Sequence, residues 1–321
     1  MPIFLDRSAK KKISIVTPCY NEEESIVECY KIVKNVIAPL LSTYDFEHIF
    51  CDNASTDNTF ILLSNIATQD KSVKIIRNSR NFGVLRNAYN GAMRSTGDAV
   101  LLFLPVDLQD PPQLIPSFIK YWEQGYEIVY GTRDEREEFF ILSWLRFTYY
   151  RFLTMISSVD YPLNAGDFQL VDRKVLSIIF STYTADPFLR LSTFYCGFSS
   201  IGISYKWLKR KHGHSRNPFS NLIIQALDGI ISFSSLPIRL VGFLGLIVVL
   251  ISFILSLLLP FLIYVRILPS AQQGVLLIIV LTLLLNGITV LSLSILGEYI
   301  ARILNQVRNR PVVIERESIN F

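Results

Sequence analysis

Cysteine and histidine are scarce in this sequence, and its net charge is small. Its 321 residues include four cysteines and three histidines. The cysteines form no CxxC pair, and we assign them no role, because a cytoplasmic domain would keep them reduced. The net charge is only +4, which favours contact with an anionic membrane over binding of nucleic acid. The opening MPIFLDRSAKKK is basic where the apolar part of a cleavable signal would begin, so we expect no such signal.

Charge is also missing from two long stretches near the C-terminus. Hydrophobic residues make up 50% of the chain, and its mean hydropathy is +0.37. No charged residue occurs in 241–265 or in 267–297, and only Arg266 separates the two stretches. Each exceeds the roughly 20 residues that a helix needs to cross a bilayer. We therefore predict a two-helix transmembrane hairpin within 236–303, the alternative being a pair of buried core helices.

The arginines around these stretches predict the orientation. Arg239 precedes the first stretch, and four arginines follow the second, at positions 302, 308, 310 and 316, whereas the connection YVRILPSAQQG carries a single positive charge. By the positive-inside rule both ends face the cytoplasm. We expect an integral protein of the cytoplasmic membrane, with a cytoplasmic domain at 1–235 and a cytoplasmic tail at 304–321.

Two further stretches are typical of helices that lie in the lipid headgroup layer. Residues 139–159 are rich in aromatics with only two arginines, and 218–235 lead into the first apolar stretch. Aromatic rings and basic side chains are favoured at that depth. A buried core helix is the alternative for the first stretch.

The first 107 residues alternate between strand-like and helix-like patterns. Strands are predicted at 11–18, 46–53, 73–78 and 98–107, and helices at 21–41, 55–69 and 84–96. This alternation predicts an α/β fold, a Rossmann-like parallel sheet covered by helices on both faces. Ligands of such sheets bind beyond the carboxyl ends of the strands. Polar clusters follow the four strands in turn: TPCYNEEE, CDNASTD, RNSRNFG and VDLQDPP.

With these clusters, the sequence resembles the family 2 glycosyltransferases of GT-A fold. It is more closely similar to the polyprenyl-phosphate glycosyltransferases, which include dolichol-phosphate mannose synthase and bacterial undecaprenyl-phosphate glucosyltransferases. The resemblance extends through YGTRDER, AGDFQLVDR, the GHSR stretch and the closing GEYIARI. It implies a nucleotide sugar and a polyprenyl phosphate as substrates and a membrane location. The number of copies in the assembly is left open, a homo-oligomer included.

The resemblance also assigns roles to single residues of the donor site. It implies that Mg²⁺ or Mn²⁺ is held by Asp107 and Gln109, with Asp107 central to catalysis. The family's usual DAD has lost its first acid to Pro105, so we expect weaker metal binding. The nucleotide pocket is assigned, by the same resemblance, to Pro18, Tyr20, Glu22, Asp52 and Asn53. Asn53 stands where a second acid is common, and its amide can still hydrogen-bond a base.

The acceptor side and the catalytic carboxylate follow from the same resemblance. It assigns the donor diphosphate and the lipid phosphate to Arg133, Arg136, Arg210, Ser215 and Arg216, for which arginine's planar fork is suited. The basic stretch before residue 217 has a simpler interpretation as a solvated surface against anionic lipid. Asp167 is the candidate catalytic carboxylate, unless it only ties a loop together. Asp110, before two prolines, is interpreted as a turn cap.

The expected function is inverting transfer of a hexose to undecaprenyl phosphate, with glucose from UDP-glucose as the first choice. One alternative is mannosyl transfer from GDP-mannose. A second is a catalytically silent membrane scaffold that kept the fold, suggested by Pro105 and Asn53. A processive polysaccharide synthase is disfavoured, because no QxxRW stretch is found and two membrane helices are few for a channel.

Overall fold

The structure is a computed structural model, and it describes residues 10–135, 162, 165–181, 189–206, scattered positions between 274 and 307, and 311–321. The chain divides into two compact units. The first contains Met1–Thr154, Val159–Arg216 and Asn309–Phe321, and the second contains Met155–Ser158 and Asn217–Arg308. The C-terminal residues therefore return to the unit that holds the N-terminal part of the chain.

The described strands of the first unit form one mixed sheet of eight, in the order β7-β5-β6-β4-β1-β2-β3-β8. Its parallel centre consists of the strands predicted from the sequence, β1 (Lys11–Cys19), β2 (Tyr44–Asp52), β3 (Val73–Asn78) and β4 (Ala99–Leu101). The remaining strands are β5 (Ile128–Glu135), β6 (Ala165–Asp172), β7 (Ser200–Lys206) and β8 (Glu315–Ile319). The predicted α/β class is confirmed, with antiparallel pairs joining β6 to β4 and β8 to β3.

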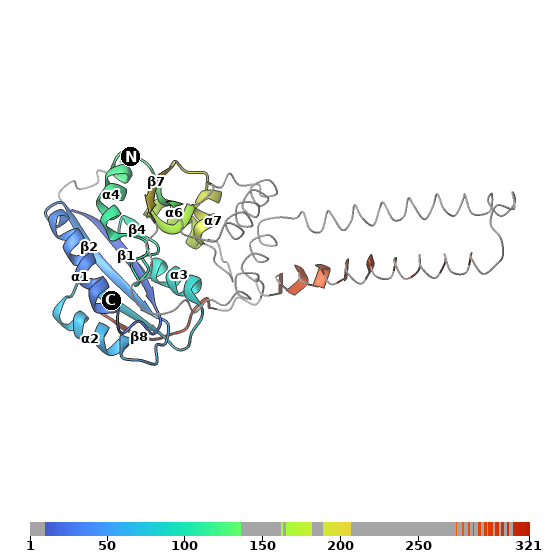
Figure 1. The fold of residues 1–321 in the computed structure, drawn as a ribbon, viewed down its shortest axis with the longest axis horizontal. Helices are drawn as coiled ribbons and strands as arrows, with labels where there is room; N and C mark the ends of the chain where they lie inside the picture. The colour runs from blue at the N-terminus through green and yellow to red at the C-terminus, as the bar shows by residue number, and fades with distance from the viewer. Residues whose placement is uncertain are drawn as a thin grey trace, which may run out of the picture. The chain divides into compact units, whose positions relative to one another are not determined.

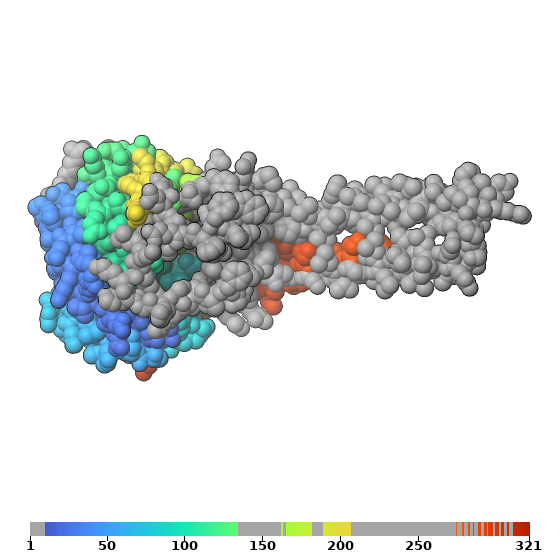
Figure 2. Space-filling model, viewed as in Figure 1, coloured from blue at the N-terminus to red at the C-terminus, as the bar shows by residue number. Residues whose placement is uncertain are grey.

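Helices cover both faces of this sheet. One face carries α1 (Ile26–Ile37), α2 (Thr59–Gln69) and α4 (Ile115–Glu123), and α1 contacts the other two. Residues of α1 and α4, blue and green in Figure 2, reach the surface side by side. The other face carries α3 (Val84–Arg94) and α6 (Arg173–Ser181), which meet through Tyr89 and Phe180. Figure 1 shows α1 and α2 on one side of the strands and α3 on the other. The short α7 (Leu189–Tyr195) packs on β6. One 3₁₀ turn, Ala38–Leu40, follows α1, and a second, Pro112–Leu114, leads into α4.

The central strands are apolar along their length because both of their faces are covered. β1 is buried from Ile13 to Cys19, as expected of a parallel strand inside a doubly covered sheet. Helix α3 approaches its face closely: a Cβ on Gly91 would lie 2.4 Å from Sγ of Cys51 and 2.7 Å from Cγ1 of Val16. Only glycine permits this approach, which lets α3 pack directly against β1 and β2.

Several predicted boundaries differ from the structure, and two of them differ by five residues or more. The strand predicted at 98–107 forms a regular ladder only over Ala99–Leu101. Beyond it the amide of Leu102 donates to the carbonyl of Gln169 and that of Leu104 to the carbonyl of Val16, and Pro105 has no amide to continue the ladder. The helix predicted from residue 21 begins at Ile26, because Asn21 has a φ of 54° and the residues after it form a loop.

The C-terminal tail contains a strand that the sequence did not indicate. Glu315–Ile319 pairs antiparallel with β3 as strand β8 and forms an edge of the sheet. Asn320, which follows it, donates to the carbonyls of Ala67 and Val73, at 2.8 Å each. Glu317 of β8 thus lies next to Arg77 of β3, although the two residues are 240 positions apart in the chain.

The described positions between 274 and 307 are all helical. They include large exposed apolar side chains, at Leu293, Leu296, Ile300, Ile303, Leu304 and Val307. Among the residues that the structure describes, no helix is both long and apolar enough to cross a membrane. The predicted interfacial helices at 139–159 and 218–235 lie outside the described residues, as does the first predicted transmembrane helix.

Candidate active site

The four polar clusters predicted from the sequence follow neighbouring central strands, at the end of the sheet where the carboxyl ends of these strands lie. The register pairs Cys19 of β1 with Asp52 of β2, and Asp52 with Arg77 of β3. The three strand ends are therefore level, and the loops after them start side by side. This arrangement is the one expected where a parallel sheet binds a ligand, beyond the carboxyl ends of its strands.

Hydrogen bonds join the loop after β1 to the loop after β2. The amide of Asn21 donates to Oγ of Ser55 at 2.9 Å, and the amide of Thr56 donates to Oδ1 of Asn21 at 2.8 Å. The amide of Glu22 donates to Oγ1 of Thr59 at 2.8 Å. Of the residues assigned to the nucleotide in this cluster, Pro18 is buried within β1, whereas Tyr20 and Glu22 are partly exposed. The backbone bonds hold these two side chains at the edge.

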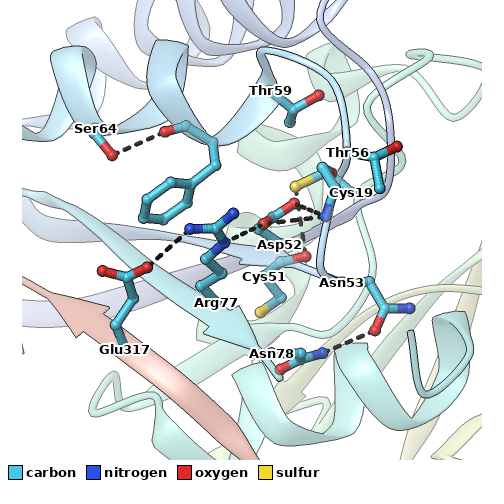
Figure 3. A network of polar contacts seen from close by, with 12 residues as sticks. Cys19, Cys51, Asp52, Asn53, Thr56, Thr59, Ser64, Arg77, Asn78 and Glu317 are labelled. Atoms are coloured by element: carbon cyan, nitrogen blue, oxygen red, sulfur yellow. Dashed lines mark hydrogen bonds and ion pairs between the residues drawn. The ribbon is translucent and has the colours of Figure 1, made fainter. Parts of the chain in front are cut away.

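Asp52 is the buried acid of this edge. Its side chain is fully buried, and its carboxylate accepts from the amide of Ser55 at 3.2 Å. Nε of Arg77 lies 3.6 Å from Oδ2 of Asp52. Burial raises the pKa of the Asp52 carboxyl, and the bonds from Ser55 and the charge of Arg77 act in the opposite direction. The site therefore contains a buried carboxylate whose ionised form is favoured by Ser55 and by Arg77 (Figure 3).

Asn53, the second residue assigned to the nucleotide, is the centre of an asparagine network. Its Oδ1 accepts from Nδ2 of Asn78 at 2.9 Å and from the amide of Phe82 at 3.0 Å, and its Nδ2 donates to Oδ1 of Asn81 at 2.8 Å. Asn78 also donates to Oδ1 of Asn87, at 2.8 Å. Figure 3 shows Asn53 facing Asn78, away from Asp52. The amide at position 53 thus positions the RNSRNFG loop, and a carboxylate could not replace it, because it has no hydrogen to donate to Oδ1 of Asn81.

Asp107 and Gln109 lie in the turn after β4. The amide of Gln109 donates to Oδ1 of Asp107 at 3.2 Å, and the amide of Leu108 donates to the carbonyl of Pro105 at 3.1 Å. Leu108 has a φ of 56°, an uncommon conformation for a branched side chain and one that often marks a functional turn. Both Asp107 and Gln109 are partly exposed.

These two residues supply oxygen atoms, which Mg²⁺ and Mn²⁺ prefer. In the described part of the chain, no three histidine, cysteine, aspartate or glutamate side chains gather closely enough to hold a metal ion. Asp107 and Gln109 thus offer two oxygen ligands, and a metal ion held there would take its other ligands from water and from a bound diphosphate.

Asp110 is part of a buried ion pair and is not simply a turn cap. It is 1% exposed, and it accepts from Nε of Arg133 at 3.2 Å and from Nη2 at 3.0 and 2.9 Å. The hydroxyl of Tyr205 also donates to it. Burial alone would lower the pKa of Arg133, but Asp110 and Tyr205 raise it above its ordinary value. The interpretation from sequence failed because Arg133 and Tyr205 are brought to Asp110 by strands β5 and β7.

A second ion pair lies on the neighbouring strand. Nε of Arg190, on α7, donates to Oδ1 of Asp167, on β6, at 2.9 Å. Burial raises the pKa of Asp167, but Arg190 and then Arg133 outweigh this effect and lower it below its ordinary value. Asp167 is therefore ionised near neutral pH. Arg190 was not predicted from the sequence, where its only signal is a lone charge in the apolar segment PFLRLSTF.

The structure brings most of the predicted residues that it describes together in two groups, and Asp107 and Gln109 lie apart from both in sequence, in the turn after β4. The first group contains Pro18, Tyr20, Glu22, Asp52 and Asn53 at the ends of β1 and β2. The second group joins strands β5, β6 and β7, and it contains Arg133 and Asp167. Arg136, Arg210, Ser215 and Arg216 lie outside the described residues. The roles assigned to all of these residues stay predictions.

Comparison with known proteins defines the class of the chain. The family model described as glycosyl transferase family 2 matches residues 14–180. The chain belongs to this family and is a glycosyltransferase, in agreement with the GT-A-like mixed sheet described above.

Similar proteins extend over nearly the whole chain. It is 33% identical to the uncharacterized glycosyltransferase YkcC of Bacillus subtilis, over 95% of this chain and 93% of that protein. It is 32% identical to the bactoprenol glucosyl transferase of Shigella phage SfII, over 96% of this chain and 98% of that protein. A solved mannosyltransferase, PcManGT from Pyrobaculum calidifontis in complex with GDP-Man and Mn²⁺, is 16% identical over 64% of this chain and 59% of that chain, with a TM-score of 0.45. That likeness is too distant to bear on the function.

Proposed function

We propose that the protein transfers glucose from UDP-glucose to a polyprenyl phosphate, undecaprenyl phosphate, with inversion at the anomeric carbon. The observation that carries the proposal is the similarity to the SfII bactoprenol glucosyl transferase, which covers 96% of this chain. It therefore includes the C-terminal region beyond the family match, which ends at residue 180. The polar edge of the sheet supports the proposal, because it offers oxygen ligands and a buried acid where a nucleotide sugar would bind.

The proposed reaction is one displacement. An oxygen of the lipid phosphate attacks the anomeric carbon from the face opposite the diphosphate, so the new carbon–oxygen bond forms as the bond to the diphosphate breaks. The lipid phosphate is ionised near neutral pH and needs little help from a base. Asp167, kept ionised by Arg190, can orient the glucose hydroxyls by accepting from them.

Asp107 and Gln109 would hold Mg²⁺ or Mn²⁺ together with the diphosphate of the donor. Such a metal, when bound, stabilises the negative charge that develops on the leaving diphosphate. Arg133 is paired with Asp110, which follows Asp107 by three positions in the chain, and the charge of Asp110 keeps Arg133 protonated.

We further propose that the protein is integral to the cytoplasmic membrane, with its catalytic domain and both termini in the cytoplasm. Strand β8 supports this topology. It is hydrogen-bonded to β3, so the residues before 206 and after 311 share one compartment. Any membrane crossings between them must be even in number, as in the predicted hairpin. Tags at either terminus should be reached only from the cytoplasmic side, and a tag at Ser270 only from outside; termini that label on opposite sides would contradict the proposal.

The proposal is tested by transfer from labelled nucleotide sugars. Purified full-length protein is incubated with undecaprenyl phosphate and with UDP-glucose, UDP-GlcNAc or GDP-mannose. We expect a labelled lipid from UDP-glucose, and loss of its formation in Asp107→Asn, which keeps the shape of the side chain and removes its charge. Preferred transfer from GDP-mannose would refute the choice of donor, and near-normal turnover of Asp107→Asn at saturating metal would refute the role of Asp107.

A further inference from the structure

The C-terminal strand reaches the donor site through one side chain. In the register of β3 and β8, Glu317 lies directly opposite Arg77. Its Oε1 lies 3.0 Å from Nη1 of Arg77. The other edge of the same guanidinium faces Asp52, with Nε 3.6 Å from Oδ2. Figure 3 shows the three side chains in a row, with Arg77 between the two carboxylates.

Arg77 is held on three sides. Besides the two carboxylates, its guanidinium carbon stacks 4.1 Å from the ring centroid of Phe60 on α2. The ring fixes the plane of the guanidinium, but a planar group can still turn and slide on an aromatic face. Glu317 removes that freedom by binding Nη1, the end directed away from Asp52. With its outer end bound, Arg77 keeps Nε toward Asp52.

Asp52 depends on this orientation because it is fully buried. A buried carboxylate loses its hydration and needs compensating charge or hydrogen bonds to stay ionised. Ser55 supplies hydrogen bonds, and among the residues that the structure describes Arg77 is the cation paired with Asp52. If Arg77 turned toward solvent, Asp52 would lose that compensation and become a poorer acceptor for a ligand.

We propose that Glu317 is a positioning residue of the donor site, which acts through Arg77 on Asp52, so that strand β8 is part of the machinery that binds the nucleotide. The inference rests on the proposed function, because it assigns Asp52 to the nucleotide of the donor. It adds that the segment after the predicted membrane hairpin contributes to donor affinity.

The strand offers a matched control for this role. Glu315 lies on the same strand and carries the same charge, but its Oε1 accepts from Nδ2 of Asn90 at 2.9 Å and lies 3.5 Å from Nε of Arg94. Both partners are on α3, on the opposite face of the sheet from Phe60. Glu315→Gln therefore loses a charge and a contact between β8 and the domain, as Glu317→Gln does, without affecting Arg77.

The test measures UDP affinity by calorimetry, and KM and kcat for UDP-glucose, on the full chain. We expect Glu317→Gln to weaken UDP binding and raise KM about fivefold, the effect of a partly exposed ion pair, with kcat within about twofold of wild type. Glu315→Gln should leave both constants within about twofold. Melting temperatures establish that the variants are folded.

A double-variant cycle tests the route through Arg77. In an Arg77→Met background, Glu317→Gln should have no further effect on UDP affinity, because the residue through which it acts is gone. Arg77→Lys is a further single variant. Its ammonium group keeps the charge but cannot bridge two carboxylates at once, so we expect its KM for UDP-glucose to be higher than that of the wild type. These two variants keep the test decisive if Glu317→Gln lowers stability.

Three results would overturn the inference: equal effects of Glu317→Gln and Glu315→Gln on UDP affinity, a fall in kcat at unchanged KM, or additive effects in the Arg77→Met background. Failure of the proposed function would differ from all three. In that case the wild-type protein itself would bind neither UDP nor GDP, and the inference would fall with the function it rests on. Wild-type binding of UDP with equal binding by Glu317→Gln contradicts the inference alone.

Discussion

Asp110→Asn separates a buried ion pair from a turn cap by its effect on stability. The substitution keeps the shape of the side chain and leaves Arg133, which is 17% exposed, without its anionic partner. Removing one partner of a buried ion pair costs about 3–5 kcal/mol. Loss of a capping interaction costs about 1 kcal/mol. In a domain of this size about 1 kcal/mol corresponds to roughly 2–4 °C in Tm, so we expect Tm to fall by at least about 6 °C.

The assay is thermal unfolding of the full-length protein, with Asp172→Asn as a matched control. Asp172 accepts from the amide of Lys174 through Oδ1 at 2.8 Å and from Nε1 of Trp122 through Oδ2 at 2.7 Å, so Asp172→Asn keeps one of these two bonds and loses the other. We expect a shift of no more than about 3 °C there. Replacing both partners, in Asp110→Leu with Arg133→Met, should recover part of the lost stability. An Asp110→Asn variant that melts within about 3 °C of wild type would refute the ion-pair reasoning.

Two further predictions concern pH and metal. Glu47 is buried, and although burial alone would raise its pKa, bonds from Lys74, Ser14, Thr96 and Lys12 lower it to about 2. Its folded pKa lies below the ordinary value of 4.5, so its contribution of about 3 kcal/mol is present above pH 4.5 and is lost as pH falls toward 2. Glu47→Gln should destabilise the protein by that amount at pH 7 and flatten its pH–stability profile below 4.5; equal profiles in urea titrations would contradict this. For the metal, calorimetry should show weak Mn²⁺ binding without UDP and tight binding with it, and Pro105→Asp should tighten binding without UDP. Tight binding to the nucleotide-free wild type would mean that other residues complete the site.

The sequence by itself determined the class of the fold and the edge at which to look. Periodicity and strand length are local signals, so the alternation over the first 107 residues predicted strands β1 to β4 and a parallel sheet. The polar clusters after them were predicted to share one edge, because parallel strands end together. The resemblance to the family could also be identified from the sequence, because the family's motifs are short segments that are recognisable without knowledge of the fold.

Only the tertiary structure decided which polar groups pair with one another. Asp110 meets Arg133 and Tyr205 across 23 and 95 positions of the chain, and Asp167 meets Arg190 across 23. A sequence contains no signal for such pairs, because they depend on which strands are neighbours in the sheet. The resemblance assigned position 53 to the nucleotide, and the structure adds that its side-chain amide is hydrogen-bonded to Asn78, to Asn81 and to the backbone amide of Phe82.

Strand β8 is the clearest case of a feature hidden from the sequence. Its residues, ERESI, show no apolar alternation and resemble a solvated tail. They form a strand because β3 presents an open edge, and charged side chains are what an edge strand tolerates. A pairing between residues 240 positions apart cannot be predicted from local periodicity. The strand is stabilised by backbone hydrogen bonds to β3 and by Arg77, which are distant from it in the sequence.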